Sequence, residues 1–210
     1  MTVAKDLSLL SDACKQYAEH VSREIADRDN DPRSMCFWNI HNRMMISEEI
    51  MTFYERQWGS DDFPEVDEDT EGELVERVMV VTRDLFVDVV SAIEKAVKDS
   101  VKIYKDSGLL EDALRKTSHL YLRNIMDSSV RKGLIDDSVF NEWDDILVMR
   151  NLAAHNNSVS DRNKRYEIGG IKISMRAGRM MKGPLNTFVV LTERIIELFY
   201  DWLRRIDSAE

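Results

Sequence analysis

The chain has 210 residues, enough for one large domain or two small ones, and carries a net charge of −10 with a pI near 5.0. This excess of acid excludes a generic nucleic-acid coat or a protein that binds membranes by charge alone, although a local basic site can still exist. The two cysteines, Cys14 and Cys36, have neither a CxxC spacing nor a histidine cluster beside them, so we expect no disulfide framework, no structural metal and no cofactor.

Glycine and proline are scarce, at 8 and 3 residues. Helix-breaking positions are therefore few, and long helices are expected. The opening segment mixes Lys5, Asp6 and Asp12 with apolar residues, unlike a signal peptide. No uncharged apolar run reaches the roughly 18 residues of a membrane-spanning helix. We therefore expect a cytoplasmic protein without membrane association.

Helical periodicity organises the first part of the chain. Residues 3–28 place apolar side chains at steps of three and four, which predicts one amphipathic helix. Polar residues around Pro32 interrupt this pattern, and a second helix is expected over about 35–58. Residues 59–73 contain eight acidic residues and no basic one, which predicts a solvated loop. A role for this loop as a brake on a basic surface is the less favoured alternative.

The remaining sequence predicts four more helices. They are expected over about 73–107, 110–131, 137–155 and 184–206. Asp137 or Ser138 can cap the third of them. Before the last helix, residues 156–183 predict irregular or mixed structure, in which IKISM (171–175) can form a short strand. The expected fold is all-α: a single domain over residues 1–210, built as a bundle of five or six helices with one elaborated basic loop.

A group of reactive polar residues ends the helix expected over 137–155. Residues 149–157 read MRNLAAHNN and contain Arg150, Asn151 and His155. Cleavage of RNA without a metal must move protons at the 2′-hydroxyl and the leaving oxygen, and must hold extra charge on the phosphate. Histidine suits the protons, arginine the phosphate, and an asparagine amide adds oriented donors. The three residue types therefore predict a catalytic site for RNA cleavage.

The spacing of these residues raises a geometric problem. Five residues turn an ideal helix through about 140°, so Arg150 and His155 do not share a face, whereas Asn151 and His155 do. Either the helix unwinds near Ala154, or the histidine works with groups from elsewhere. A symmetric dimer would supply such groups, because a two-fold axis brings two arginines and two histidines to one cleft.

Residues 140–157, FNEWDDILVMRNLAAHNN, closely resemble the signature helix of HEPN domains. That helical family is marked by an arginine, four to six residues and then a histidine, commonly with a polar residue directly after the arginine. The resemblance implies a metal-independent endoribonuclease that dimerises through this helix, with Arg150 and His155 catalytic and Asn151 in support. It also implies RNA as substrate and an antitoxin or defence-system protein as a partner.

One position departs from the family pattern. Asn157 stands two places after the histidine, where many toxins paired with nucleotidyltransferase antitoxins have a tyrosine that receives nucleotides. Control by modification of a tyrosine at this place is therefore not expected. Some members of the family have also lost catalysis and serve as scaffolds, so the alternative function is a non-catalytic helical scaffold or regulatory interaction protein.

Structural roles can also explain each motif residue singly. Arg150 can pair with Asp144 or Asp145 on its own helix, or with Glu142 across the bundle. His155 can favour the C-terminal end of the helix dipole, with Asn156 as a left-handed cap residue. These pairings are the alternative to a catalytic site.

A basic segment follows the motif directly. Residues 156–183 contain seven cations and only two acids, so 7 − 2 gives +5 in an otherwise acidic chain. Such a segment predicts contact with the RNA backbone; a solubilising loop or a docking surface for an acidic partner is the alternative. Tyr166 can stack on a base, or it can anchor the loop in the core. The expected RNA-binding residues are Arg162, Lys164, Arg165, Lys172, Arg176 and Arg179, and the seventh cation is Lys182.

Overall fold

The computed structural model describes residues 3–26, 30–58, 68–104, 108, 110, 121–155 and 159–209. Within these ranges the predicted all-α bundle of five or six helices is confirmed: there are six helices and one small two-stranded sheet. The helices are α1 (Val3–Glu24), α2 (Pro32–Trp58), α3 (Glu68–Ile103), α5 (Leu122–Arg131), α6 (Asp137–His155) and α7 (Thr187–Asp207). The strands are β1 (Lys164–Ile168) and β2 (Ile171–Met175). None of the helices so described has a stretch that is both long and apolar enough to cross a bilayer.

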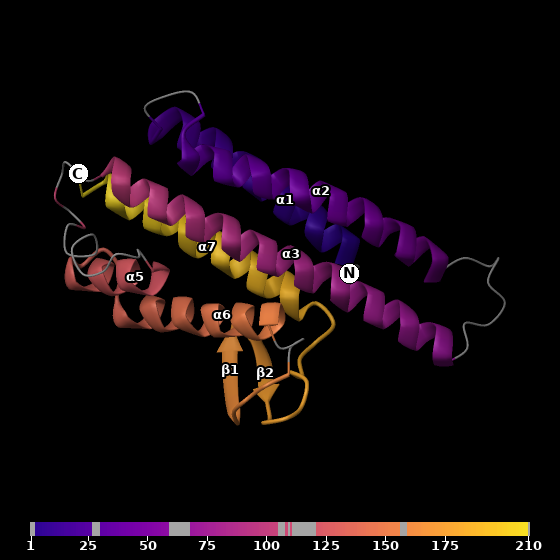
Figure 1. Cartoon of the computed structure of the whole chain (residues 1–210). Helices are drawn as coiled ribbons and strands as arrows, with labels where there is room; N and C mark the ends of the chain where they lie inside the picture. Colours follow the sequence, from indigo (N-terminus) through magenta and orange to yellow (C-terminus); the bar gives the residue numbers. More distant parts are fainter. Residues whose placement is uncertain are drawn as a thin grey trace.

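The helices lie in three levels. In Figure 1, α1 and α2 pair at the top, α3 and α7 run side by side through the middle, and α5 and α6 lie below them. The β-hairpin lies below α6 in this view and packs against α7. The middle pair supplies much of the core, and the buried side chains of α7 include Phe188, Phe199 and Trp202. This packing holds α6 at the edge of the bundle, with one side against α3 and another side open.

Two predicted boundaries in the first half are wrong. The acidic segment 59–73 is not a loop throughout, because α3 already begins at Glu68; residues 59–67 lie outside the described residues. Acidic side chains stabilise the first turn of a helix through its dipole, so the same residues that suggest a solvated loop also suit a helix start. The second helix begins at Pro32 rather than at residue 35, since the fixed backbone of proline suits the first helical position.

The second half also departs from expectation. Residues 111–120 lie outside the described residues, and residue 121 precedes α5, so the helix predicted over 110–131 is described only from Leu122. Residues 159–183 are more regular than expected, because β1 and β2 form an antiparallel hairpin in which Tyr166 pairs with Ile173. The strand predicted at 171–175 is confirmed. The last helix starts at Thr187, three residues later than predicted.

A buried ion pair lies at the end of the bundle where α2 begins and α3 ends. Arg33 and Asp31 are each 1% exposed. Arg33 donates from Nε and Nη2 to the carboxylate of Asp31, at 2.9 and 2.8 Å, and from Nη1 to the hydroxyl of Tyr104, at 2.6 Å. Although burial opposes a charge here, the hydrogen bonds to Asp31 hold the pKa of Arg33 above its ordinary value. The start of α2 is thereby fastened to the residue that follows α3.

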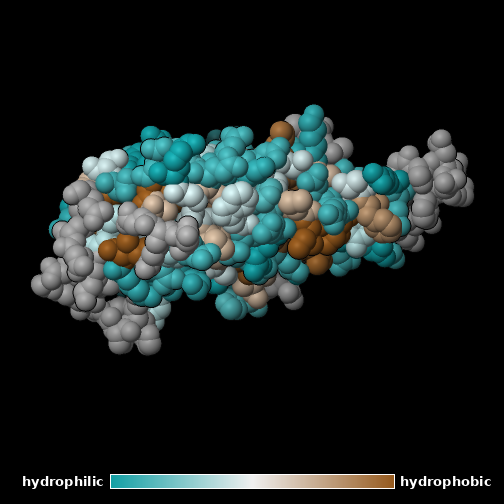
Figure 2. Space-filling view, turned by 90° about the horizontal axis from the view of Figure 1, so that it is seen from above, coloured by the Kyte–Doolittle hydropathy of each residue, from teal (hydrophilic) through white to brown (hydrophobic). Residues whose placement is uncertain are grey.

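An apolar patch remains on the outer surface of α2. Figure 2, seen from above, shows brown and tan atoms gathered over the second half of this helix. The exposed apolar side chains there are Met45, Ile46, Ile50 and Phe53. Positions 46, 50 and 53 are four and three residues apart, so they share one face of the helix.

Candidate functional site

The helix α6 carries all three motif residues, and a side-chain cap fixes its start. Asp136 Oδ1 accepts the backbone N–H of Val139 at 2.9 Å and the hydroxyl of Ser138 at 2.5 Å. The cap is thus one residue earlier than predicted, at Asp136 rather than at Asp137 or Ser138. The hydroxyl of Ser138 and the N–H of Val139 lower the pKa of the Asp136 carboxyl. The buried residues of α6 follow helical spacing: Trp143, Ile146, Met149, Leu152 and Ala153.

Arg150 is half-buried between α6 and α3. Its Nη2 donates to the hydroxyl of Ser91 on α3 at 3.0 Å, and its Nη1 donates to Oδ1 of the neighbouring Asn151 at 3.1 Å. The hydroxyl of Ser91 in turn donates to the carbonyl of Val87 at 2.7 Å. The Nε atom is buried and has no partner among the described residues. The guanidinium is therefore held by neutral groups, and its charge is not neutralised by a carboxylate in the described part of the chain.

The acids that were candidates to pair with Arg150 are engaged by other cations. Glu142 accepts two hydrogen bonds from Arg194 on α7, at 2.6 and 2.8 Å. Asp144 pairs with Arg123 at 3.1 Å, and Asp145 pairs with Lys164 at 2.9 Å. Arg150 therefore forms none of the three ion pairs that would have given it a purely structural role.

Asn151 and His155 are exposed. The helix is intact through His155, so unwinding near Ala154 does not occur. Arg150 and His155 consequently point about 140° apart around the helix, and one chain alone does not bring them together. Asn151 and His155 lie one turn apart on the same face. No hydrogen bond or ion pair involves the His155 ring among the described residues; Asn156 and Asn157 lie outside them.

The six predicted RNA-binding residues fall into two groups. Two are paired with acids: Arg162 with Asp161 at 2.8 Å and Lys164 with Asp145 at 2.9 Å. The hydrogen bond to Asp145 raises the pKa of Lys164. The other four make no ion pair within the described segments, and Lys182 joins them. These unpaired cations are Arg165, Lys172, Arg176, Arg179 and Lys182, and all five are exposed.

The pleat of the hairpin separates an anchored face from a charged face. Tyr166 is 4% exposed and lies under the ammonium of Lys164, which is 4.2 Å from the ring centroid. Tyr166 therefore anchors the hairpin in the core, and burial raises the pKa of its hydroxyl. The opposite face presents Arg165 directly across from Ser174, whose backbone is bonded on its other side to Lys182. Two exposed cations thus flank Ser174 on the outer face.

Ser91 is a neighbour of the candidate site that the sequence did not reveal. It lies 59 residues before Arg150, in the middle of α3. A serine within a helix has no spacing that marks it, and its hydroxyl usually bonds to its own backbone, as this one also does. Only the packing of α3 on α6 places it beside Arg150.

Comparison with known proteins gives no relative. No family model matches the chain, and neither a curated protein nor a solved structure is significantly similar to it. In the part of the chain that the structure describes, no three or more His, Cys, Asp and Glu side chains form a group that could hold a metal ion.

Proposed function

We propose that this protein is a metal-independent endoribonuclease of the HEPN type, acting as a toxin or in phage defence. The observation that carries the proposal is the setting of Arg150. Its guanidinium is positioned by Ser91 and Asn151, while the nearby acids are paired elsewhere. Holding a half-buried arginine without a carboxylate is costly, unless its charge serves an anionic ligand. An RNA phosphate is such a ligand.

Each motif residue has a role in this chemistry. His155 removes the proton of the ribose 2′-hydroxyl or donates one to the leaving 5′-oxygen. Arg150 stabilises the added negative charge on the phosphorane, and Asn151 orients the guanidinium through its side-chain oxygen. The products are a 2′,3′-cyclic phosphate and a 5′-hydroxyl. No cofactor enters the reaction.

The straight helix gives a reason for a homodimer. Since α6 is helical through His155, the arginine and histidine of one chain face different directions. A two-fold axis beside the end of α6 would set Arg150 of one copy against the histidine of the second copy. The exposed side chains of Asn151 and His155 leave that end of the helix accessible.

The β-hairpin supports the choice of RNA as substrate. It follows α6 in the chain, and the five unpaired cations in the hairpin and in the residues after β2 contrast with the paired cations on most of the helical surface. Arg165, Lys172, Arg176 and Arg179 are proposed to bind backbone phosphates, with Lys182 beside them. Arg162 and Lys164 contribute less, because Asp161 and Asp145 already neutralise them.

The test is cleavage of total RNA in EDTA by the wild-type protein and by His155→Ala. The wild type is expected to cut and to leave cyclic phosphate ends, whereas His155→Ala is expected to be inactive. Asn141→Ala is the matched control, since Asn141 is also exposed on α6 but ten residues before Asn151. Cleavage that disappears in EDTA, or that survives in His155→Ala, would refute the mechanism.

A second function is favoured by the apolar patch on α2. Four exposed apolar side chains on one helix suit a protein partner, such as an antitoxin or another defence-system component. If neither wild type nor variant cleaves RNA, the chain is better described as a non-catalytic helical scaffold or regulatory protein.

A further inference from the structure

A second group of unpaired cations lies at the other end of α6. A groove of about 490 Å³ runs between the turn that joins α5 to α6 and the last turns of α7. Lys132 comes from the turn, while Arg204 and Arg205 come from α7. All three are exposed and make no ion pair among the described residues. Among the described residues that line it, the only acid is Asp201. The groove is thus a local positive site on a chain whose net charge is −10.

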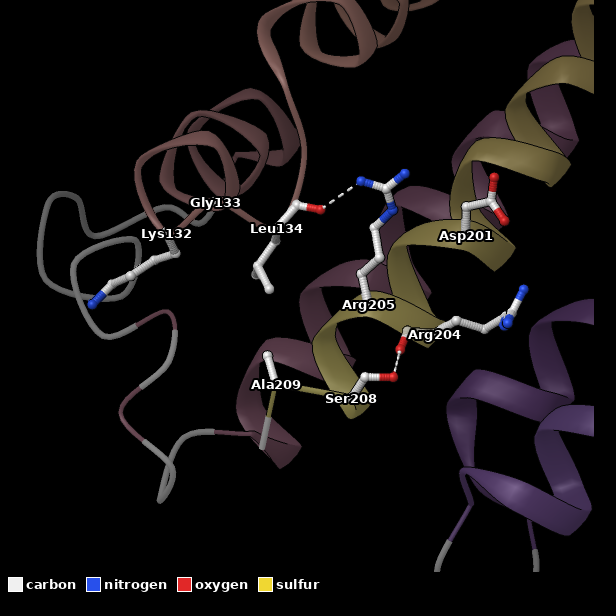
Figure 3. A pocket seen from close by; sticks show the side chains of 8 residues that line it. All are labelled: Lys132, Gly133, Leu134, Asp201, Arg204, Arg205, Ser208 and Ala209. Carbon is white, nitrogen blue, oxygen red and sulfur yellow. Dashed lines mark hydrogen bonds between the residues drawn. The ribbon is translucent and has the colours of Figure 1, made fainter.

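The two arginines are held in place by contacts other than ion pairs, as far as the described residues extend. Arg205 donates from Nη1 to the carbonyl of Leu134 at 3.1 Å, which fixes it across the groove (Figure 3). The guanidinium of Arg204 lies 5.8 Å from the centroid of the Tyr200 ring. A carbonyl and an aromatic face both orient a guanidinium and leave its remaining N–H groups available. Asp136 accepts the hydrogen bonds that cap α6, and the charge of Arg205 also helps to lower the pKa of its carboxyl, so Asp136 offsets part of the positive charge beside the groove.

The directions of the side chains indicate the shape of the ligand. Figure 3 shows the charged ends of Lys132, Arg205 and Arg204 pointing different ways rather than toward one centre. A compact anion could contact one of them at a time, whereas an extended chain of phosphates could pass along all three. The turn at Leu134 leads directly into α6, whose 19 residues span about 28 Å before His155. The groove is therefore well separated from the motif.

We infer that this groove binds the phosphate backbone of single-stranded RNA, as a second contact at the far end of α6 from His155. The choice of RNA as the polyanion rests on the proposed function. A strand held here and at the hairpin would be fastened on both sides of the bundle edge that carries α6. Neutral contacts to the bases are not required, because affinity comes from release of the counterions that surround the phosphates.

The test measures binding apart from cleavage. Fluorescence anisotropy of a 5′-labelled single-stranded RNA is recorded at several salt concentrations, with His155→Ala as the parent protein so that the RNA stays intact. Adding Arg204→Gln or Lys132→Gln is expected to weaken binding several-fold at low salt. Each is also expected to reduce the slope of log K against log salt by about 0.7, the value for one phosphate contact on a single strand.

Matched controls separate a local contact from a general loss of charge. Arg56→Gln and Lys15→Gln remove exposed cations that also lack an ion pair among the described residues but lie on α2 and α1. They are expected to leave the salt slope unchanged. Thermal unfolding of all four variants checks that the fold is intact. If the groove variants show the same slope of log K against log salt as the parent protein, the inference is wrong.

Two further outcomes distinguish this inference from the proposed function. If RNA binding depends on Lys132 and Arg204 but the wild type cuts no RNA, the groove is supported and the nuclease proposal fails. If the wild type cuts RNA while the groove variants bind it normally, the nuclease stands and the groove inference fails. Binding of ATP that depends on the groove, with RNA binding unaffected, would make this a nucleotide site and would also overturn the inference.

Discussion

The guanidinium of Arg150 on α6 donates a 3.0 Å hydrogen bond to the hydroxyl of Ser91 on α3. Its second hydrogen bond goes to the adjacent Asn151, and its Nε atom is buried without a partner among the described residues. The position of this cation therefore depends on the packing of two helices rather than on α6 alone. Changes on α3 should reach the candidate site.

Ser91→Ala removes the contact from α3. If Arg150 is catalytic, we expect RNA cleavage to fall by about 10- to 100-fold, because a misplaced group loses its alignment with the phosphate. The free energy of unfolding should change by no more than about 1 kcal/mol, which is typical for one hydrogen bond. Ser100→Ala is the control: Ser100 makes the same bond to its own helix, with its hydroxyl 2.7 Å from the carbonyl of Ala96. Equal activity of both variants would mean that Ser91 does not position Arg150.

Mixing two inactive variants tests the composite site. Arg150→Gln and His155→Ala should each be inactive alone. If each site takes its arginine from one copy and its histidine from the other, an equal mixture should recover about one quarter of the wild-type rate. Half of randomly formed dimers are mixed, and one of the two sites in each is intact. Light scattering of the wild type supplies the oligomeric state, and a monomer, or a mixture without activity, would contradict the two-fold site.

The cations in and beside the hairpin should differ in their effect on RNA binding. Arg165→Gln removes a charge that has no acidic partner in the described segments, whereas Arg162→Gln removes one already paired with Asp161. We expect Arg165→Gln to weaken RNA binding at every salt concentration and to reduce the slope of log K against log salt by about 0.7. Arg162→Gln should have a smaller effect on both the affinity and the slope. Anisotropy with the same labelled RNA makes the comparison. Equal losses in the two variants would show that ion pairing does not decide which cations contact RNA.

The cap of α6 should give a defined pH dependence. Since hydrogen bonds from Ser138 and Val139 lower the pKa of Asp136 from 3.8, the folded state favours the carboxylate. Its stabilising effect is therefore fully present above pH 3.8 and is lost as the pH falls through the lower, folded value. Asp136→Ala is expected to lower Tm by a few degrees at pH 7, and the difference from wild type should narrow in acid. Asp137→Ala, which removes the next exposed acid, should have the smaller effect; the reverse order would contradict the assigned cap.

Asp31→Ala leaves Arg33 charged and buried. Breaking a buried pair by removing one partner costs about 3–5 kcal/mol, so the urea midpoint should fall markedly. Glu24→Ala breaks the exposed pair with Arg23 and should change stability by about 1 kcal/mol or less. A small effect of Asp31→Ala would mean that water reaches Arg33 and replaces the carboxylate.

Much of the fold is visible in the sequence because periodicity is local. The apolar spacing of α1, α6 and α7 predicts helices at nearly their observed positions. The hairpin also had a local signal: Gly169 and Gly170 separate two short β-like runs, and both have positive φ, at 56° and 77°. Reading that pair as a two-residue turn would have predicted β1 as well as β2.

The site was less predictable, since charge partners are chosen by packing. The sequence places Asp144 and Asp145 on the same helix as Arg150, and Glu142, expected across the bundle, also lies on α6. Yet each of the three acids pairs with a cation from another element. Ser91 lies 59 residues away and carries no distinguishing pattern. Similarly, Lys132 and Arg205 share a groove only because α5 and α7 end at the same place.

The separation of paired from unpaired cations also has a kinetic consequence. An approaching polyanion meets a net charge of −10 and is repelled by most of the surface. Attraction is strongest where unpaired cations gather, in residues 165–182 and at the far end of α6, and it extends about 8 Å at physiological ionic strength. If RNA is the ligand, as proposed, a strand is repelled from most directions and is attracted to the two ends of α6 before it touches the protein. Only strands that approach in the right orientation would then bind. Raising the salt concentration would screen this attraction and slow association.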